Sequence, residues 1–212
     1  MVNAFLIAGG GAALAYWAVV RWPPSLGRSA LKTAALGLPL LGLAQAGWSL
    51  LALLGLAACV LGDLALSRPG ERALKAGIGA FALGHIAYVA AMVQAGDLVL
   101  PTTALPLVGC AALVVLGLST RRWLLPYAGA LRPAVAIYVA LILLMGITAF
   151  LRQPISPWLI TGALSFVASD LILAIELFRL GENRWRALTA RLVWPLYIAG
   201  QAGIMAGLGP LG

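Results

Sequence analysis

The sequence contains PAVAIYVALILLMGITAF at residues 133–150 and PWLITGALSFVASDLILAIELF at residues 157–178, joined by LRQPIS. Both runs are almost wholly apolar, and each is close to the length of about 20 residues that an α-helix needs to cross the hydrocarbon core of a bilayer. The connection between them holds a single charged residue, Arg152. The two runs therefore predict two successive membrane-spanning helices.

Similar apolar runs continue toward both ends of the chain. Six further spans are predicted at residues 3–20, 31–46, 48–67, 73–94, 101–118 and 190–208. Hydrophobic residues make up 63% of the 212 positions and charged residues only 9%, whereas roughly a quarter of the residues in a soluble domain are charged. Such a chain cannot cover its surface with polar groups. We therefore predict an all-α, polytopic transmembrane bundle of about eight helices, forming one domain over residues 1–212.

The basic residues indicate the orientation of this bundle. They give a net charge of +8, but they lie in short clusters between the apolar runs and not on a basic face with interleaved aromatic residues, which argues against a nucleic-acid partner. Thirteen of the fourteen lie in or beside the connections after the first, third, fifth and seventh spans: Arg21, Arg28, Lys32, Arg68, Arg72, Lys75, Arg121, Arg122, Arg132, Arg179, Arg184, Arg186 and Arg191. By the positive-inside rule, both termini are predicted to be non-cytoplasmic in a multi-pass protein of the cell membrane, the inner membrane in a bacterium.

The first run is predicted to be a retained helix and not a cleaved leader. Its first basic residue, Arg21, follows the apolar residues instead of preceding them, as it would in a signal peptide. The two cysteines, Cys59 and Cys110, are too few for a disulfide framework or a cysteine-based metal site. Because each lies inside an apolar run, we interpret both as packing residues.

Four ionisable residues lie inside the predicted spans, where a charged side chain costs several kcal/mol and usually faces a bundle interior or a water-filled cavity: Asp63, His85, Asp170 and Glu176. Glu176 is one turn from Arg179 at a predicted cytoplasmic end, so its carboxylate is expected to reach the membrane surface. In the predicted topology, Asp63 lies about 22 Å and Asp170 about 20 Å from the non-cytoplasmic start of its span. The two aspartates are thus predicted at nearly one level, in the cytoplasmic half of the membrane.

Other spans are predicted to bring polar residues to a comparable depth. His85 is expected near mid-membrane with Tyr88 on the same helix face, three residues on, and Tyr197 shares a face with Gln201, four residues on. Lys32 begins the second span at its cytoplasmic edge. Taken singly, Tyr88, Tyr197 and Gln201 are explained at least as well as hydrogen-bonding groups between helices.

Hydrogen bonding between helices explains less about two carboxylates at one depth with no basic residue predicted at that depth. Placed close together, Asp63 and Asp170 are expected to share a proton, so that one is neutral and the other ionised. A general acid and a general base require this arrangement.

Three segments carry a family resemblance. Residues 61–92, LGDLALSRPGERALKAGIGAFALGHIAYVAAM, contain a GD followed by H-x-x-Y; residues 162–178, GALSFVASDLILAIELF, contain an SD with a phenylalanine eight residues after the aspartate; and residues 194–207, WPLYIAGQAGIMAG, contain Y-x-x-x-Q. With Lys32 at the start of the second span, this pattern resembles the YhhN-like lysoplasmalogenase family along the whole chain. One departure is Thr33, which stands where the family often has proline.

The resemblance implies hydrolysis of the vinyl ether bond of a lysoplasmalogen, a lysophospholipid, to a fatty aldehyde and glycerophosphocholine or glycerophosphoethanolamine. It also implies that Asp63 and Asp170 are the catalytic residues. Protonation of the vinyl ether at its β-carbon gives an oxocarbenium ion that water captures, and two carboxyl groups can supply the proton and activate the water. The binding residues would be Lys32 at the phosphate and His85, Tyr88, Tyr197 and Gln201 around the water and the glycerol oxygens. No cofactor or metal is expected.

Two other functions fit the same residues. Asp63, His85 and Asp170 could hold a metal ion with an open position in a metal-dependent intramembrane hydrolase, although catalytic zinc sites usually use two or three histidines and this chain has one. Alternatively, the carboxylates could couple a small transporter to protons. Membrane lipids are the expected surroundings, and a homodimer stays open. The Gly203-to-Gly207 GxxxG pattern is interpreted as packing within the chain.

Overall fold

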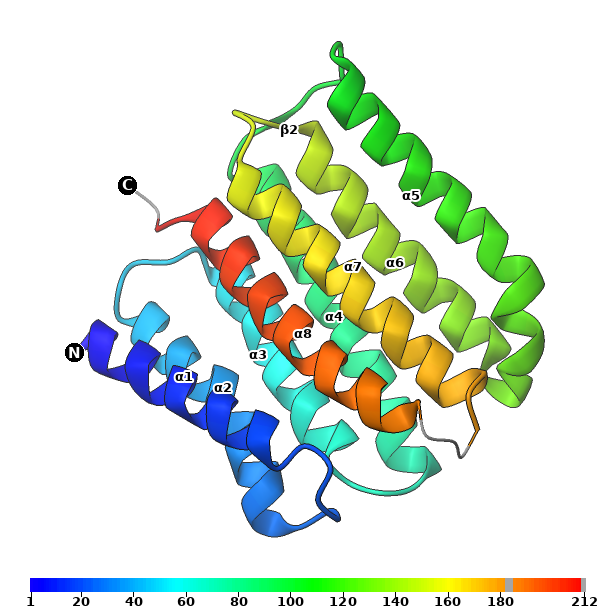
Figure 1. Ribbon diagram of the computed structural model, residues 1–212. Coiled ribbons are helices and arrows are strands. Elements are labelled where there is room, and N and C mark those ends of the chain that lie inside the picture. The colour runs from blue at the N-terminus through cyan, green and yellow to red at the C-terminus, as the bar shows by residue number, and fades with distance from the viewer. Residues whose placement is uncertain (182–184, 211–212) are drawn as a thin grey trace. The chain divides into compact units, whose positions relative to one another are not determined.

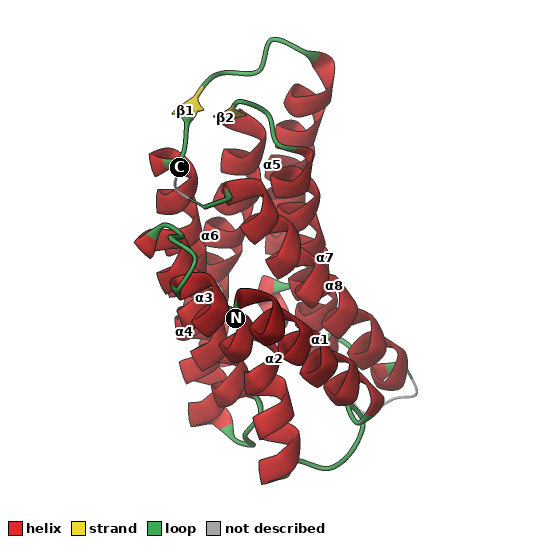
Figure 2. Ribbon diagram, turned by 90° about the vertical axis from the view of Figure 1, so that its left-hand side faces the viewer, coloured by secondary structure: helices red, strands yellow, loops and turns green. Residues whose placement is uncertain are grey.

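The computed structural model of the protein describes residues 1–181 and 185–210. The described residues form eight α-helices: α1 (Val2–Ala18), α2 (Leu26–Ala44), α3 (Leu50–Leu66), α4 (Glu71–Gln94), α5 (Ala104–Trp123), α6 (Arg132–Leu151), α7 (Pro157–Phe178) and α8 (Arg186–Leu208). Two 3₁₀ turns, η1 (Leu125–Tyr127) and η2 (Gly129–Leu131), connect α5 to α6. Figure 2 shows that helices dominate the chain and that the strands are very short. The all-α prediction is confirmed.

The predicted and observed helix boundaries agree best for α7, which has a clear start signal. The α7 helix spans the predicted residues, beginning at Pro157 after Ser156, whose side chain accepts a hydrogen bond from the Leu159 amide. The α2 helix begins five residues earlier than predicted, because Ser25 caps its amino end by accepting from the Arg28 amide at 3.2 Å. Similarly, α8 begins at Arg186 instead of residue 190. Arg184, which was counted among the orientation signals, lies outside the described residues.

Within the part of the chain that the structure describes, four helical segments are long and apolar enough to cross a membrane: Glu71–Gln94, Ala104–Tyr127, Gly129–Leu151 and Pro157–Phe178. The helices Val2–Ala18 and Leu50–Leu66 are apolar but shorter. These helices mark the chain as a membrane protein. The number of eight crossings and the orientation of the termini stay predictions.

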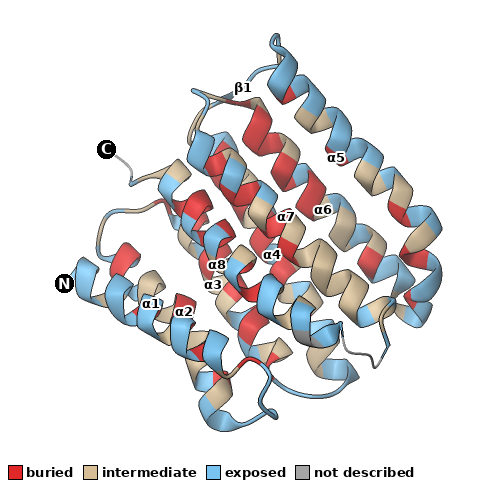
Figure 3. Cartoon of the chain, viewed as in Figure 1, coloured by how far each residue is buried: buried red, intermediate tan, exposed pale blue. Residues whose placement is uncertain are grey.

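The α5 helix illustrates the environment that these helices require. Its buried residues are Pro106, Leu113 and Thr120, which recur every seven positions and form one narrow seam. The other residues of the helix are exposed or half-buried and largely aliphatic, as the pale blue and tan segments along α5 in Figure 3 show. An apolar surface of this extent is unusual on a soluble monomer. It suits a helix surrounded by lipid.

The chain forms two compact units. Of the described residues, one unit contains 1–88 with 209 and 210, and the other contains those from 89 to 208, so the division falls within α4. In the first unit α1 packs against α2 and α2 against α3; in the second, α5 packs against α6, α6 against α7 and α7 against α8 (Figure 1). Each unit thus has its own helix packing, and the single domain stays a prediction.

The connection between α6 and α7 contains structure that the sequence did not predict. Strand β2 (Arg152–Gln153) pairs antiparallel with β1 (Asp97–Leu98). The buried Arg152 guanidinium donates to the Ala95 carbonyl oxygen at 2.9 Å and to that of Pro154 at 3.3 Å. The one basic residue predicted on the non-cytoplasmic side therefore binds backbone carbonyls and joins two connections.

Glycines allow α7 and α8 to approach at backbone distance. A Cβ added at Gly203 would lie 2.6 Å from the Cα of Gly162, and one added at Gly207 would lie 2.5 Å from the amide nitrogen of Leu159. Gly200 faces the backbone of Phe166 in the same way. Because two of these glycines form the GxxxG pattern, the prediction that this pattern serves packing within the chain is confirmed.

Gly203→Ala is expected to lower the free energy of unfolding by about 3 kcal/mol, the upper end of the usual cost of overpacking, because the atoms it meets are backbone. Thermal unfolding in detergent measures the effect. The matched control is Gly79→Ala in α4, where an added Cβ meets no atom of the described residues within 4 Å. Equal stability of the two variants would contradict close packing of α7 on α8.

Candidate functional site

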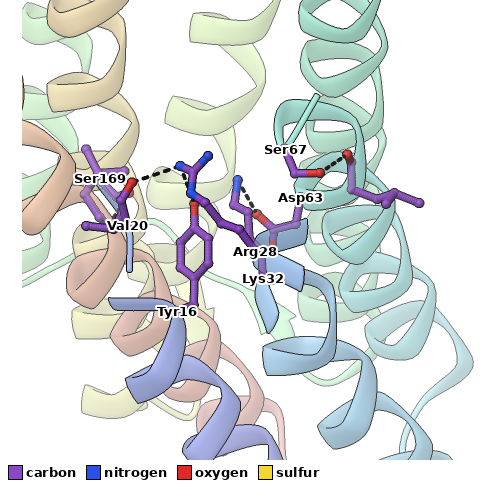
Figure 4. A network of polar contacts seen from close by, with 9 residues as sticks. Tyr16, Val20, Arg28, Lys32, Asp63, Ser67 and Ser169 are labelled. Atoms are coloured by element: carbon purple, nitrogen blue, oxygen red, sulfur yellow. Dashed lines mark hydrogen bonds and ion pairs between the residues drawn. The ribbon is translucent and has the colours of Figure 1, made fainter. Parts of the chain in front are cut away.

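In the first unit, Asp63 of α3 forms an ion pair with Lys32 of α2. The lysine Nζ lies 3.1 Å from Oδ1 of the carboxylate, and the exposed fractions of the two side chains are 12% for Lys32 and 1% for Asp63 (Figure 4). The prediction that Asp63 has no basic partner at its depth is therefore wrong. The error follows from the early start of α2: counted from Leu26, Lys32 lies about 9 Å along the helix and not at its opening.

The burial of this pair makes the lysine important to the aspartate. Removing a carboxylate from water costs several kcal/mol, and a neighbouring cation with good geometry offsets much of that cost. The ammonium of Lys32 is therefore placed to offset the cost of burying the Asp63 carboxylate.

Arg28 is a second cation on the same face of α2, one turn before Lys32, and sequence reasoning treated it only as an orientation signal. Its Nη2 donates to the Val20 carbonyl oxygen at 2.9 Å and to the Tyr16 hydroxyl at 3.3 Å (Figure 4). Its guanidinium also lies over the Tyr16 ring, 5.5 Å from the centroid. Arg28 thus joins the end of α1 to the start of α2 and stabilises the helix that carries Lys32.

His85 and Tyr88 of α4 are both fully buried, as the predicted shared face requires. Gly55 of α3 makes room for the Tyr88 ring, because a Cβ at that position would lie 2.6 Å from the ring carbons. In the same way, Gly62 accommodates the Phe81 ring at 2.7 Å. The glycine of the GD motif therefore has a packing role, since it lets an aromatic residue of α4 lie against the turn of α3 that carries the aspartate.

In the second unit, Asp170 accepts a hydrogen bond at Oδ2 from the hydroxyl of Tyr138 on α6. Both side chains are half-buried. The preceding residue, Ser169, is buried and donates to the Val193 carbonyl oxygen of α8 at 3.0 Å. The SD motif thus links α7 to both neighbouring helices, the serine to α8 and the aspartate to α6.

Tyr197 and Gln201 of α8 are both buried, in agreement with their predicted common face. The Tyr197 ring meets Phe166 of α7 edge-on, with 5.3 Å between the centroids, and lies 5.7 Å from the Trp194 ring. Aromatic pairs of this geometry stabilise packing beyond their buried area. Tyr197 therefore contributes to the contact between α7 and α8.

Glu176 contacts the start of α8. Its Oε2 accepts a hydrogen bond from the Thr189 hydroxyl, and its Oε1 lies 3.9 Å from Nε of Arg186. Arg179 donates to the Trp123 carbonyl oxygen at 2.8 Å and stacks on the Tyr127 ring. That the Glu176 carboxylate reaches the membrane surface stays a prediction.

The structure brings Lys32 to Asp63 within one unit and Tyr138 to Asp170 within the other. Each aspartate lies thirteen residues after the first residue of its helix, so each is about 20 Å along its own axis. Their common depth stays a prediction. Over residues 1–181 and 185–210, no group of three or more histidine, cysteine, aspartate or glutamate side chains is placed to hold a metal ion.

Comparison with known proteins gives one family and two named relatives. The YhhN family model matches residues 12–208. Proteins named lysoplasmalogenase from Mycobacterium bovis and Mycobacterium tuberculosis are each 29% identical over 133 residues, which cover 62% of this chain and 49% of each relative. The chain thus matches about half the length of these curated relatives. No solved structure matches the chain.

Proposed function

The chain belongs to the YhhN family, and on that basis we propose that it is a membrane hydrolase that cleaves the vinyl ether bond of lysoplasmalogens. The observation that carries the proposal is the family match over residues 12–208, a range that includes both Asp63 and Asp170. The lysoplasmalogenase name of the two mycobacterial relatives supports the substrate class. The products are a fatty aldehyde and glycerophosphocholine or glycerophosphoethanolamine.

The reaction consumes one water and needs one acid and one base. A proton added to the β-carbon of the vinyl ether leaves an oxocarbenium ion at the carbon bonded to oxygen. Water attacks that carbon and loses a proton, which gives a hemiacetal. The hemiacetal hydroxyl then loses its proton as the bond to the glycerol oxygen breaks and that oxygen takes up a proton, which releases a fatty aldehyde and an alcohol. The protein must therefore donate a proton to carbon and stabilise a developing cation.

The ion pair of Asp63 with Lys32 supports a division of these roles. A carboxylate held in its ionised form by an ammonium 3.1 Å away is suited to stabilise the oxocarbenium ion and to accept the proton of the attacking water. Asp170 is then proposed as the proton donor.

The remaining predicted residues keep binding roles in this proposal. A lysine ammonium has three N–H donors, so Lys32 can contact Asp63 and a substrate phosphate oxygen together. His85 and Tyr88 are proposed to hold the water, and Tyr197 and Gln201 the glycerol oxygens. These assignments, like the cell-membrane location and the lipid surroundings, stay proposals.

Purified protein in detergent is expected to release aldehyde from a lysoplasmalogen and none from the matching saturated ether, because an alkyl ether has no β-carbon that can accept a proton. Aldehyde is measured with a coupled dehydrogenase. Equal cleavage of the two lipids would contradict the vinyl ether mechanism. The alternatives give different results: a metal-dependent hydrolase loses activity on chelation, and a proton-coupled transporter gives no turnover without a membrane.

A further inference from the structure

We propose that Tyr138 is a positioning residue for Asp170. The Tyr138 hydroxyl orients the Asp170 carboxyl group and stabilises the carboxylate that remains after the proton has been transferred. This inference rests on the proposed function, because it concerns the same reaction. It is carried by the hydrogen bond between the Tyr138 hydroxyl and Oδ2 of Asp170, which joins two helices across 32 positions of sequence.

The helix geometry explains why these two residues meet. Tyr138 lies thirteen residues before the last residue of α6, and Asp170 lies thirteen residues after the first residue of α7. At a rise of 1.5 Å per residue, each is about 20 Å from the short connection between the two helices. In an antiparallel pair, equal distances from the connection give equal heights. The backbone therefore brings Tyr138 to the level of Asp170 whatever the flanking apolar residues are.

The bond also selects which oxygen of Asp170 gives the proton. Because Tyr138 donates to Oδ2, that oxygen acts as an acceptor in this contact, and the transferable proton is assigned to Oδ1. The hydrogen bond fixes the side-chain torsion of a half-buried aspartate and aims Oδ1 in one direction. A proton donor held in one orientation reacts faster than one that rotates among several.

The hydrogen bond from the Tyr138 hydroxyl changes in strength during the reaction. Before proton transfer the hydroxyl donates to a neutral carboxylic acid, and afterward it donates to a carboxylate. Hydrogen bonds to a charged acceptor are roughly twice as strong as those between neutral groups. The contact therefore strengthens as the proton leaves Oδ1, which lowers the barrier to proton transfer and does not tighten substrate binding.

The effect of a Tyr138 variant on kcat and KM distinguishes the positioning role from a purely structural role as a link between α6 and α7. Tyr138→Phe removes one hydroxyl and keeps the ring, so helix packing is retained. We expect kcat for aldehyde release to fall about 10- to 100-fold, as the loss of a hydrogen bond to a charged group implies, with KM within about twofold of the original value. The matched control is Tyr127→Phe, which makes the same change at an exposed tyrosine of the same unit and is expected to leave kcat unaltered.

The same substitution made in the Asp170→Asn protein separates a positioning role of Tyr138 from a packing role. In the Asp170→Asn protein, Tyr138→Phe is expected to cause no further loss, because the group through which the hydroxyl acts can no longer donate the proton. An unchanged kcat in Tyr138→Phe alone, a rise in KM alone, or an equal fold-loss in both backgrounds would overturn the positioning role. If the original protein releases no aldehyde from any lysoplasmalogen, the proposed function fails, and the role of Tyr138 fails with it. Activity in the original protein with an unaffected Tyr138→Phe variant rejects the positioning role alone.

Discussion

Asp170→Asn is expected to lower kcat for aldehyde release by about 10³-fold, within the range that a positioned general acid contributes. Asparagine has the shape of aspartate but has no proton to give to the vinyl carbon. Folding is expected to be unaffected, because the Tyr138 hydroxyl can donate to the amide oxygen as it does to Oδ2 of the carboxyl group. The measurements are kcat from aldehyde release and the thermal unfolding midpoint of the same preparation.

Glu176→Gln is the matched control for this variant. It makes the same chemical change on the same helix, six residues further on, where the glutamine oxygen can still accept from Thr189. Aldehyde release by Glu176→Gln is expected to equal that of the original protein. Retained activity in both Asp170→Asn and Asp63→Asn would reject the aspartate mechanism.

Lys32→Met is expected to lower the free energy of unfolding by about 3–5 kcal/mol, because it leaves the carboxylate of Asp63 buried without its cation. Methionine keeps most of the length of the lysine chain, so the loss comes from charge and not from a cavity. The double variant Lys32→Met/Asp63→Asn is expected to recover most of the stability, since no buried charge remains. It is expected to be inactive. Thermal unfolding in detergent and aldehyde release together measure these effects.

Lys75→Met supplies the comparison for a lysine that is not buried. Lys75 pairs with Glu71 at 2.7 Å one turn away, but the exposed fractions of these side chains are 55% and 67%. Exposed pairs of this kind contribute little to stability, so the unfolding midpoint of Lys75→Met is expected to match that of the original protein. If Lys32→Met were as stable as Lys75→Met, Asp63 would not be held as a buried anion by Lys32.

Composition was sufficient to predict the fold class, because a chain with so few charged residues has few other ways to satisfy its backbone than helices in lipid. The α7 boundaries were also predictable, since Ser156 and Pro157 are strong helix-start signals. The start of α2 was not predicted. Counting apolar residues omits a polar first turn and gives no weight to Ser25, the residue that caps the helix. Because the predicted start was too late, Lys32 was placed at the edge of the span, and its ion pair with Asp63 was not predicted.

Tyr138 was missed for a different reason. A lone tyrosine in an apolar helix is usually a packing residue, and neither its sequence neighbours nor the motif around Asp170 indicates otherwise. The signal lies in the length of the α6–α7 hairpin, in which both residues are thirteen positions from the connection. Equal spacing from a short turn can be read from sequence once the helix ends are known. Pairing of β1 with β2 has no such signal, because each strand is two residues long.

Few residues of α5 are constrained by contacts with the rest of the protein. Only Pro106, Leu113 and Thr120 are buried against the protein, whereas the other described positions of this 20-residue helix are exposed or half-buried. At exposed positions in lipid, the requirement is a side chain that is apolar and compatible with a helix, and many residues meet it. The exposed α5 positions are therefore specified by little beyond hydrophobicity. The three buried residues are joined by Gly109 and Gly117 as constrained positions, because an added Cβ would lie 2.4 Å from Phe150 and 2.6 Å from Leu143, respectively.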